Sequence, residues 1–396
     1  MPSLFGHEFR QWLVAAAVVS AASSVLPVRP AGGEEPAAKP AAKSQSDPFA
    51  VPDGTPEALL KYIEELKLER PTADSREVVR DFVKKQSGAL LTAADKILAA
   101  KPNAEQAKAA VQYKLIALGM LGRLGDPDAE KKLAAMPDEL TKAGYKALVR
   151  DVRIELLAQQ LRRIDPADAE DFAKLLDEIK TFLAEGPLDP GDAHLAVETA
   201  MAAEASGDAR LGERTYAEMA KILAKSDDRA IAKLAATLRG AARRLGLVGK
   251  PFSLQGTTVE GKPLDWKKYA GNVVLVDFFA TWCGPCREEM PNIQENYDAY
   301  HARGFDVVGV SVDHDRNALD DFLSEHKHPW TVLLDATEAA GTDQSLATYY
   351  GIIGIPQTIL VGKDGKVVTL AARGPDLRRE LEKLLGPVKE KAKEKD

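Results

Sequence analysis

Both cysteines of this 396-residue chain lie in one short stretch, residues 277–290, which reads DFFATWCGPCREEM. Cys283 and Cys286 are separated by only two residues. A disulfide across so short a gap closes almost no loop and adds little entropic stabilisation, so the pair is predicted to be chemical rather than structural. Two adjacent thiols support thiol–disulfide exchange, because one attacks a target disulfide and the other expels the product.

The residues around the cysteines suit that chemistry. A helix is predicted over residues 286–300, so Cys283 lies at its N-terminal end, where free N–H groups and the helix dipole stabilise a thiolate. Pro285 fits the first turn of a helix, and Gly284 lets the backbone of another protein approach. Arg287 is an exposed cation that either helps to hold Cys283 as a thiolate or is simply solvated.

Zinc binding is the alternative use of two cysteines at this spacing. The chain has no third cysteine, so the other ligands would have to be histidines. The candidates are His301, His314, His326 and His328. None has a partner at the spacing of a ligand pair on a helix face, which argues against a metal site. His194, alone in the helical part, is predicted to be a surface or packed residue.

Asp277 lies inside the apolar run VVLVDFFA at residues 273–280, which is typical of a strand buried on both faces. Burial raises the pKa of a carboxyl, which suits a proton carrier near neutral pH. The alternative is a buried acid that only makes hydrogen bonds.

After residue 248, apolar runs alternate with helical periodicity, which predicts a small mixed sheet with helices on both faces. Strands are expected at residues 252–254 and 257–259 as a hairpin, and at 273–280, 305–312, 331–334, 358–361 and 367–371. Helices are expected at residues 286–300, 317–326 and 375–385. In the extra segment 335–351, Thr342 is expected to cap a helix that ends near Tyr350, and Glu338 and Asp343 are candidates for a second acid.

Residues 57–247 are rich in Ala, Leu, Glu and Lys, with apolar positions at steps of three and four, which predicts eight to ten helices. Asp-Pro pairs at residues 126–127, 165–166 and 189–190 are predicted helix starts. An all-α domain, in the form of a repeat or solenoid, is expected. It serves either as a spacer or as a surface that binds a partner protein.

The chain termini differ from the rest. Residues 12–26 carry no charge and suit a signal-peptide core, so residues 1–31 are expected to be a signal peptide or an N-terminal anchor. Export to the periplasm or cell envelope follows. Residues 32–56 are predicted to be a disordered linker, and residues 387–396 a charged tail. The net charge of −7 gives no reason to expect nucleic acid binding.

The sequence WCGPC after the strand VVLVDFFAT resembles the thioredoxin fold, over residues 248–385. Its surroundings resemble the TlpA/ResA-like, membrane-tethered thiol-disulfide oxidoreductases of bacterial envelopes, within the redoxin superfamily. The helical part shows no such likeness. The resemblance implies a multidomain chain: an N-terminal all-α domain at residues 57–247 and a C-terminal α/β thioredoxin-like domain at residues 248–386.

The resemblance also implies roles for single residues. Cys283 matches the nucleophile, Cys286 the resolving thiol, and Asp277 the acid that takes the proton of the resolving thiol. Pro291 matches the proline that kinks the active-site helix. Ile355 and Pro356 match the cis-proline loop, which is expected to contact the substrate together with Trp282, Gly284 and Pro285.

Two departures from the family pattern affect Asp277. TlpA/ResA-like proteins often have a neutral residue at that position. Thioredoxin also has a lysine beside the acid, from the next strand, but here that strand reads DVVGVSV and contains none.

The predicted activity is that of an extracytoplasmic protein thiol-disulfide oxidoreductase. The Gly-Pro dipeptide favours a reductase, and the resemblance implies a membrane thiol donor of the DsbD or CcdA kind and apocytochrome c as a client. No cofactor beyond the cysteine pair, no metal and a monomeric state are expected. The alternatives are a thiol peroxidase, although Ala280 stands where that class needs threonine, and a helical scaffold protein with an accessory thioredoxin-like domain.

Overall fold

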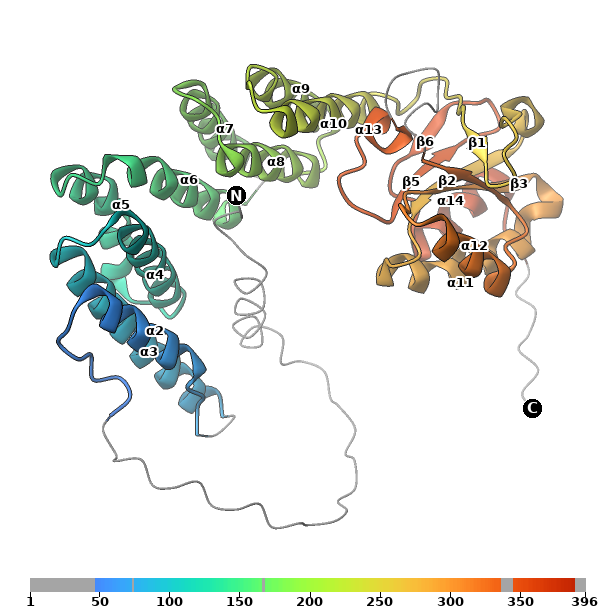
Figure 1. Ribbon diagram of the computed structural model, residues 1–396. Coiled ribbons are helices and arrows are strands. Elements are labelled where there is room, and N and C mark those ends of the chain that lie inside the picture. The colour runs from blue at the N-terminus through green and yellow to red at the C-terminus, as the bar shows by residue number, and fades with distance from the viewer. Residues whose placement is uncertain (1–46, 73–74, 166–167, 336–344, 389–396) are drawn as a thin grey trace, which may run out of the picture. The chain divides into compact units, whose positions relative to one another are not determined.

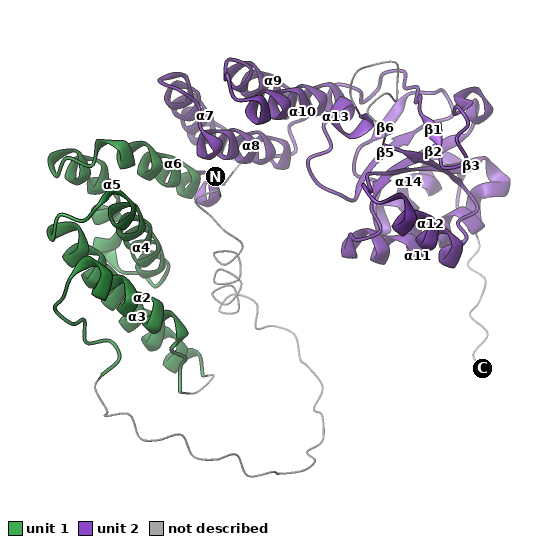
Figure 2. Cartoon of the chain, viewed as in Figure 1, with its two compact units in different colours: residues 1–160 green, residues 161–396 purple. Residues whose placement is uncertain are grey.

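The computed structural model describes residues 47–72, 75–165, 168–335 and 345–388. The chain forms two compact units, residues 1–160 and 161–396 (Figure 2). This division differs from the domain boundary expected near residue 248, because four helices before that residue belong to the second unit. The predicted signal segment and the acids Glu338 and Asp343 lie outside the described residues. Among those described, no helix is both long and apolar enough to cross a membrane.

The first unit contains helices α2 to α6. Their bounds are α2 Pro56–Leu68, α3 Arg76–Ala99, α4 Ala104–Arg123, α5 Pro127–Lys142 and α6 Lys146–Arg163, whose last turn extends into the second unit. Two apolar clusters form the core, one around Leu90 and Ile97 and one around Leu118 and Met136. Side-chain caps begin the helices, as at Asp126 before Pro127.

Residues 47–55 pack against helix α3 of the first unit, although their composition predicts part of a linker. The ring of Phe49 meets that of Phe82 edge-on at 5.5 Å between centroids, and Asp53 pairs with Lys96 at 2.6 Å. The few large apolar side chains of this stretch therefore pack on the core of the first unit. The average composition of the segment does not predict this packing.

The second unit begins with four helices after the end of α6. They are α7 Ala169–Ala184, α8 Pro190–Ala205, α9 Ala209–Leu223 and α10 Arg229–Leu245. Asp168 caps α7, so the predicted start at residues 165–166 is wrong, whereas Asp189 caps α8 as expected. With α2 to α6, the described residues up to 247 form nine helices, within the predicted range.

A six-stranded sheet follows, in the order β1-β4-β3-β2-β5-β6. Figure 1 labels all of these strands except β4. The strands are β1 Thr257–Thr258, β2 Val273–Phe279, β3 Phe305–Ser311, β4 Thr331–Leu334, β5 Gln357–Val361 and β6 Val367–Thr369. The central β2 pairs parallel with β3 and antiparallel with β5. The fold is thus the mixed sheet of a thioredoxin-like domain, as predicted.

The two faces of the sheet bury different clusters. One contains Leu275 and Phe279 together with apolar residues of α11 Gly284–Tyr300, α12 Arg316–His326 and α14 Pro375–Leu385. The other contains Val276 and Phe278 together with α13 Leu346–Tyr350. Because side chains alternate along a strand, the odd-numbered residues of β2 face α11 and α14.

The hairpin predicted at residues 252–259 is wrong. The backbone N–H of Phe252 donates to Gly365 O at 2.9 Å, so this segment lies along the turn between β5 and β6. β1 pairs instead with β4, in antiparallel orientation. Helix α13 is capped by Ser345, while Thr342 lies outside the described residues.

Candidate active site

Cys283 and Cys286 form a disulfide at the start of α11, with an S–S distance of 2.10 Å and a Cα–Cα distance of 5.3 Å. Cys283 is the N-cap residue of the helix, and its Sγ accepts a hydrogen bond from the Cys286 N–H at 3.2 Å. The first turn of α11 therefore directs N–H groups at this sulfur, the arrangement that stabilises a thiolate once the disulfide is reduced.

The surface beside Cys283 is open. Trp282 is 68% exposed, and Gly284 and Pro285 are exposed as well. A Cβ atom built on Gly284 would meet nothing within 4 Å. The three residues predicted to contact substrate around the cysteines thus form a surface that another protein can approach.

Asp313 holds the loop that enters the motif. Its carboxylate accepts hydrogen bonds from the backbone N–H of Thr281 at 3.0 Å and from the Thr281 hydroxyl at 2.7 Å. Ser311 donates to the same carboxylate at 2.9 Å. The end of β3 thereby fixes the residue two positions before Cys283, a contact that the sequence analysis did not find.

The cis-proline loop lies across from the cysteines. The peptide bond between Ile355 and Pro356 is cis, as the resemblance implies. Cys283 Sγ is 3.8 Å from the carbonyl oxygen of Ile355. Pro356 is buried and Ile355 half-buried, so the residue before the proline is the more accessible of the two. An extended client segment that reached Cys283 would therefore run beside the Ile355 backbone.

Asp277 lies in the middle of β2 on the face that packs against α11, and it is only 3% exposed. Burial, and then the charge of Glu289, raise the pKa of Asp277 to about 7, while the Arg373 guanidinium acts in the opposite sense. In the described part of the chain, its Oδ1 atom has no hydrogen-bond partner. The direction of this shift agrees with the raised pKa that the sequence predicts, and such a carboxyl is suited to gain and lose a proton near neutral pH.

The structure explains why no lysine accompanies Asp277. Its register partner on β3 is Gly309, and a Cβ atom there would lie 3.0 Å from the ring of Phe279. The cation that acts on Asp277 comes instead from Arg373, in the loop before α14, which also donates to Pro356 O at 3.3 Å. Nothing near Asp277 in the sequence indicates that Arg373 takes the place of the lysine.

Glu289 was also missed. It follows Cys286 by three residues, the spacing that places two side chains on one helix face, so this signal was available. The Glu289 carboxylate accepts from the Gly374 N–H at 2.8 Å and from the Asn292 amide at 2.7 Å. These bonds hold a second carboxylate beside Asp277.

Thr358 is the register partner of Asp277 on β5. It is fully buried, and within the described residues its hydroxyl has no hydrogen-bond partner. Within the part of the chain that the structure describes, two buried oxygen atoms without hydrogen-bond partners, Asp277 Oδ1 and Thr358 Oγ1, therefore lie on adjacent strands, which is uncommon in a protein core.

The other sequence candidates lie apart from this chemistry or pack elsewhere. Pro291 is inside α11, and Arg287 is exposed on the same helix. His301 stacks on Tyr297, His326 on Phe322 and His328 on Trp330, with ring centroids 4.4, 4.3 and 4.7 Å apart. His314 is exposed, and His194 pairs with Glu198 at 3.4 Å.

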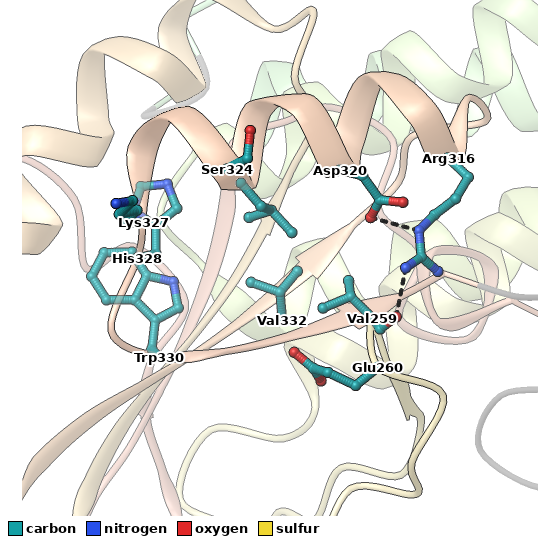
Figure 3. A pocket seen from close by; sticks show the side chains of 10 residues that line it. Val259, Glu260, Arg316, Asp320, Ser324, Lys327, His328, Trp330 and Val332 are labelled. Carbon is teal, nitrogen blue, oxygen red and sulfur yellow. Dashed lines mark hydrogen bonds and ion pairs between the residues drawn. The ribbon is translucent and has the colours of Figure 1, made fainter.

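A separate hollow of about 500 Å³ lies between α12 and the sheet edge (Figure 3). Arg316, on its rim, is held by Asp320 at 2.7 Å and by the carbonyl of Val259 at 2.6 Å. None of the residues predicted for the redox site lines it. It is therefore not part of the cysteine site.

A disulfide at a helix N-terminus, a facing cis-proline and this strand order define a thioredoxin-fold thiol-disulfide oxidoreductase. The Redoxin family model matches residues 247–385. ResA of Bacillus thuringiensis subsp. konkukian, a thiol-disulfide oxidoreductase, is 30% identical over 129 residues, which are 33% of this chain and 70% of the relative. ResA of Bacillus subtilis is 30% identical over 117 residues, 30% of this chain and 61% of the relative. The chain belongs to the ResA family of thiol-disulfide oxidoreductases.

Solved structures similar to this chain cover about a third of it. The thioredoxin domain of a thiol-disulfide oxidoreductase from Bacteroides vulgatus is 31% identical and covers 34% of this chain and 97% of its own, with a TM-score of 0.31. A thiol:disulfide interchange protein of the thioredoxin family from Chlorobium tepidum is 28% identical, covers 34% of this chain and 94% of its own, and has a TM-score of 0.30.

Proposed function

We propose that this oxidoreductase reduces disulfides in other proteins outside the cytoplasm. One observation carries the proposal: Cys283 Sγ accepts the Cys286 N–H at 3.2 Å and lies 3.8 Å from the Ile355 carbonyl. The attacking sulfur thus accepts a hydrogen bond at the N-terminus of a helix, and it lies beside a backbone with which a client strand can pair.

The reaction has two steps. The Cys283 thiolate attacks a client disulfide, so one S–S bond forms with the client and the other client sulfur leaves as a thiolate. Cys286 then gives its proton to Asp277 and attacks Cys283, which releases the second client thiolate and restores the Cys283–Cys286 disulfide. The client gains two electrons and the enzyme pair loses two.

Asp277 suits the role of proton acceptor because its raised pKa lies close to neutral pH. It faces α11, the helix that carries Cys286. Arg373 and Glu289 act on the same carboxyl with opposite signs, so the proton is transferred within a small group of charges.

Export, the electron donor and the client are further parts of the proposal. The uncharged run at residues 12–26 supports export. In an oxidising compartment the pair has to be reduced again, for which a membrane thiol donor of the DsbD or CcdA kind is suited. Apocytochrome c is the proposed client by family resemblance.

The test is the reduction potential of the Cys283–Cys286 pair in the full chain, equilibrated in thiol–disulfide redox buffers. A value near that of thioredoxin, about −270 mV, is expected of a reductase. A value near that of the oxidant DsbA, about −120 mV, would reverse the proposed direction.

A further inference from the structure

Helix α10 packs against α13, the short helix that precedes the cis-proline loop (Figure 1). The two backbones touch at a pair of glycines. A Cβ atom on Gly240 would come within 3.0 Å of the backbone of α13, and one on Gly351 within 3.0 Å of the backbone of α10. Gly351 also has a φ of +62°, which favours glycine. The sequence thus permits a contact between main chains that any side chain would prevent.

Helix α10 supplies the donors for two of the C-terminal carbonyls of α13. Two other carbonyls of α13 accept from the residues that directly follow the helix: Gly351 N–H donates to Thr348 O at 3.2 Å, and Ile352 N–H donates to Ala347 O at 2.8 Å. The carbonyls of the last two helical residues, 349 and 350, accept instead from the guanidinium groups of residues 243 and 244. Cations at a helix C-terminus also oppose its partial negative charge.

The two arginines differ in their surroundings. Arg243 also covers the ring of Tyr349, with its guanidinium carbon 4.1 Å from the centroid. Arg244 is only 3% exposed and pairs with Glu204 of α8 at 3.0 Å. Glu204 in turn accepts from the hydroxyl of Tyr216, on α9, at 2.8 Å. Three helices before the sheet therefore converge on the end of α13.

The same short helix is tied to the redox site. Tyr350 packs against Phe278, the neighbour of Asp277 on β2, with ring centroids 6.1 Å apart. Five residues after Tyr350 comes Ile355, whose carbonyl faces Cys283 Sγ at 3.8 Å. Whatever fixes the end of α13 therefore fixes one end of the loop beside which a client would lie.

We propose that helices α8 to α10 are a brace for the cis-proline loop, in which Arg243 and Arg244 are positioning residues for the binding of client proteins. The effect on catalysis rests on the proposed reductase function, whereas the effect on the loop does not. The contacting face of α10 is occupied by the enzyme's own helix. A partner protein would therefore have to use other faces of these helices.

The variant to test is Arg243→Ala in the full chain. This side chain lies at the edge of the junction, so the fold is expected to survive its removal. Arg239→Ala is the matched control, since Arg239 is exposed on the same helix. For both variants, insulin, a protein disulfide, is assayed with dithiothreitol as electron donor. Dithionitrobenzoate, a small disulfide that needs no strand pairing, is assayed as a single turnover of the pre-reduced enzyme after dithiothreitol has been removed, because dithiothreitol itself reduces this compound.

Arg243→Ala is expected to raise KM for insulin about tenfold, the effect of losing one charged hydrogen bond, with kcat changed less than about twofold. The single-turnover rate with dithionitrobenzoate and the reduction potential are expected to equal those of the wild type and of Arg239→Ala. An unchanged KM for insulin would overturn the proposal. So would an equal loss on both substrates, because that result indicates general damage.

Hydrogen exchange separates the brace from the proposed function. The Ile352 amide, bonded to Ala347 O, is expected to exchange about tenfold faster in Arg243→Ala, because removal of the brace frees the end of α13. The Arg287 amide, bonded to Cys283 O in α11, is expected to stay as in the wild type. If the wild type reduces neither disulfide, the proposed reductase function is wrong. The exchange rate of the Ile352 amide still shows whether α8 to α10 brace the cis-proline loop. Unchanged exchange at Ile352 would overturn the proposed brace.

Discussion

Two helix ends in the second unit meet opposite charges. At the N-terminus of α11, an N–H group points at Cys283 Sγ, which becomes negative when the disulfide is reduced. At the C-terminus of α13, carbonyl groups accept from the cationic side chains of Arg243 and Arg244. The same backbone electrostatics serves chemistry at one end and, in our proposal, positioning at the other. The comparison predicts that substitutions at α11 change the reaction, while those at α13 change binding and stability.

The largest effect is expected at the cysteines. Cys283→Ser removes the attacking thiolate, so insulin reduction should fall to the background rate. Cys286→Ser leaves the attack intact but removes the resolving thiol, so a mixed disulfide with insulin should accumulate. Mass spectrometry of the non-reduced products measures this adduct. An adduct that forms with Cys283→Ser instead would exchange the roles of the two thiols.

Asp277→Asn is expected to change both stability and rate. The folded state keeps the Asp277 carboxyl protonated up to its pKa of about 7, whereas an unfolded chain releases that proton near its ordinary value of 3.8. The folded protein therefore binds more protons between these values, and the stability present below pH 4 is lost as pH rises through 7. The free energy of unfolding falls by ~4 kcal/mol over this range. The asparagine variant does not undergo this loss, because its side chain does not titrate.

The measurement is urea unfolding of the oxidised full chain at pH 4 and pH 8, followed by tryptophan fluorescence. Three of the four tryptophans lie in the second unit, at residues 266, 282 and 330. Asp277→Asn should be the more stable protein at pH 8 and lose that advantage at pH 4. If Asp277→Asn and the wild type were equally stable at pH 4 and also at pH 8, the raised pKa of Asp277 would be refuted. In the reductase assay, the asparagine variant should resolve mixed disulfides more slowly.

The sequence predicted the α11 end far better than the α13 end, and the reason is physical. At α11 the signals are local: two cysteines at fixed spacing, a proline for the first turn and an acid in an apolar strand. The β4 strand and the α14 helix were predicted with the bounds that they have in the structure. At α13 the partners are far apart, since Arg243 bonds a carbonyl 106 residues away. Backbone carbonyls leave no mark on the sequence, and Arg373 reaches Asp277 only through tertiary structure.

The smallest of these effects has opposite signs in two helices. Gly240→Ala adds a methyl group where the backbone of α13 leaves no room, so it should destabilise the second unit by about 1–3 kcal/mol. Gly88→Ala makes the same change inside α3, where a Cβ atom meets nothing within 4 Å. There alanine should stabilise the first unit by about 0.5–1 kcal/mol, because glycine costs a helix interior that much.

Calorimetry of the full chain measures both variants, and each serves as the control of the other. A destabilised Gly240→Ala with a stabilised Gly88→Ala separates close backbone contact from intrinsic helix preference. If Gly240→Ala were stabilising too, α10 would not be held against α13, and the brace would lose its structural basis while the chemistry at α11 stayed as proposed. The sign of the stability change that Gly240→Ala causes therefore decides whether helices α8 to α10 are held against the thioredoxin-like domain.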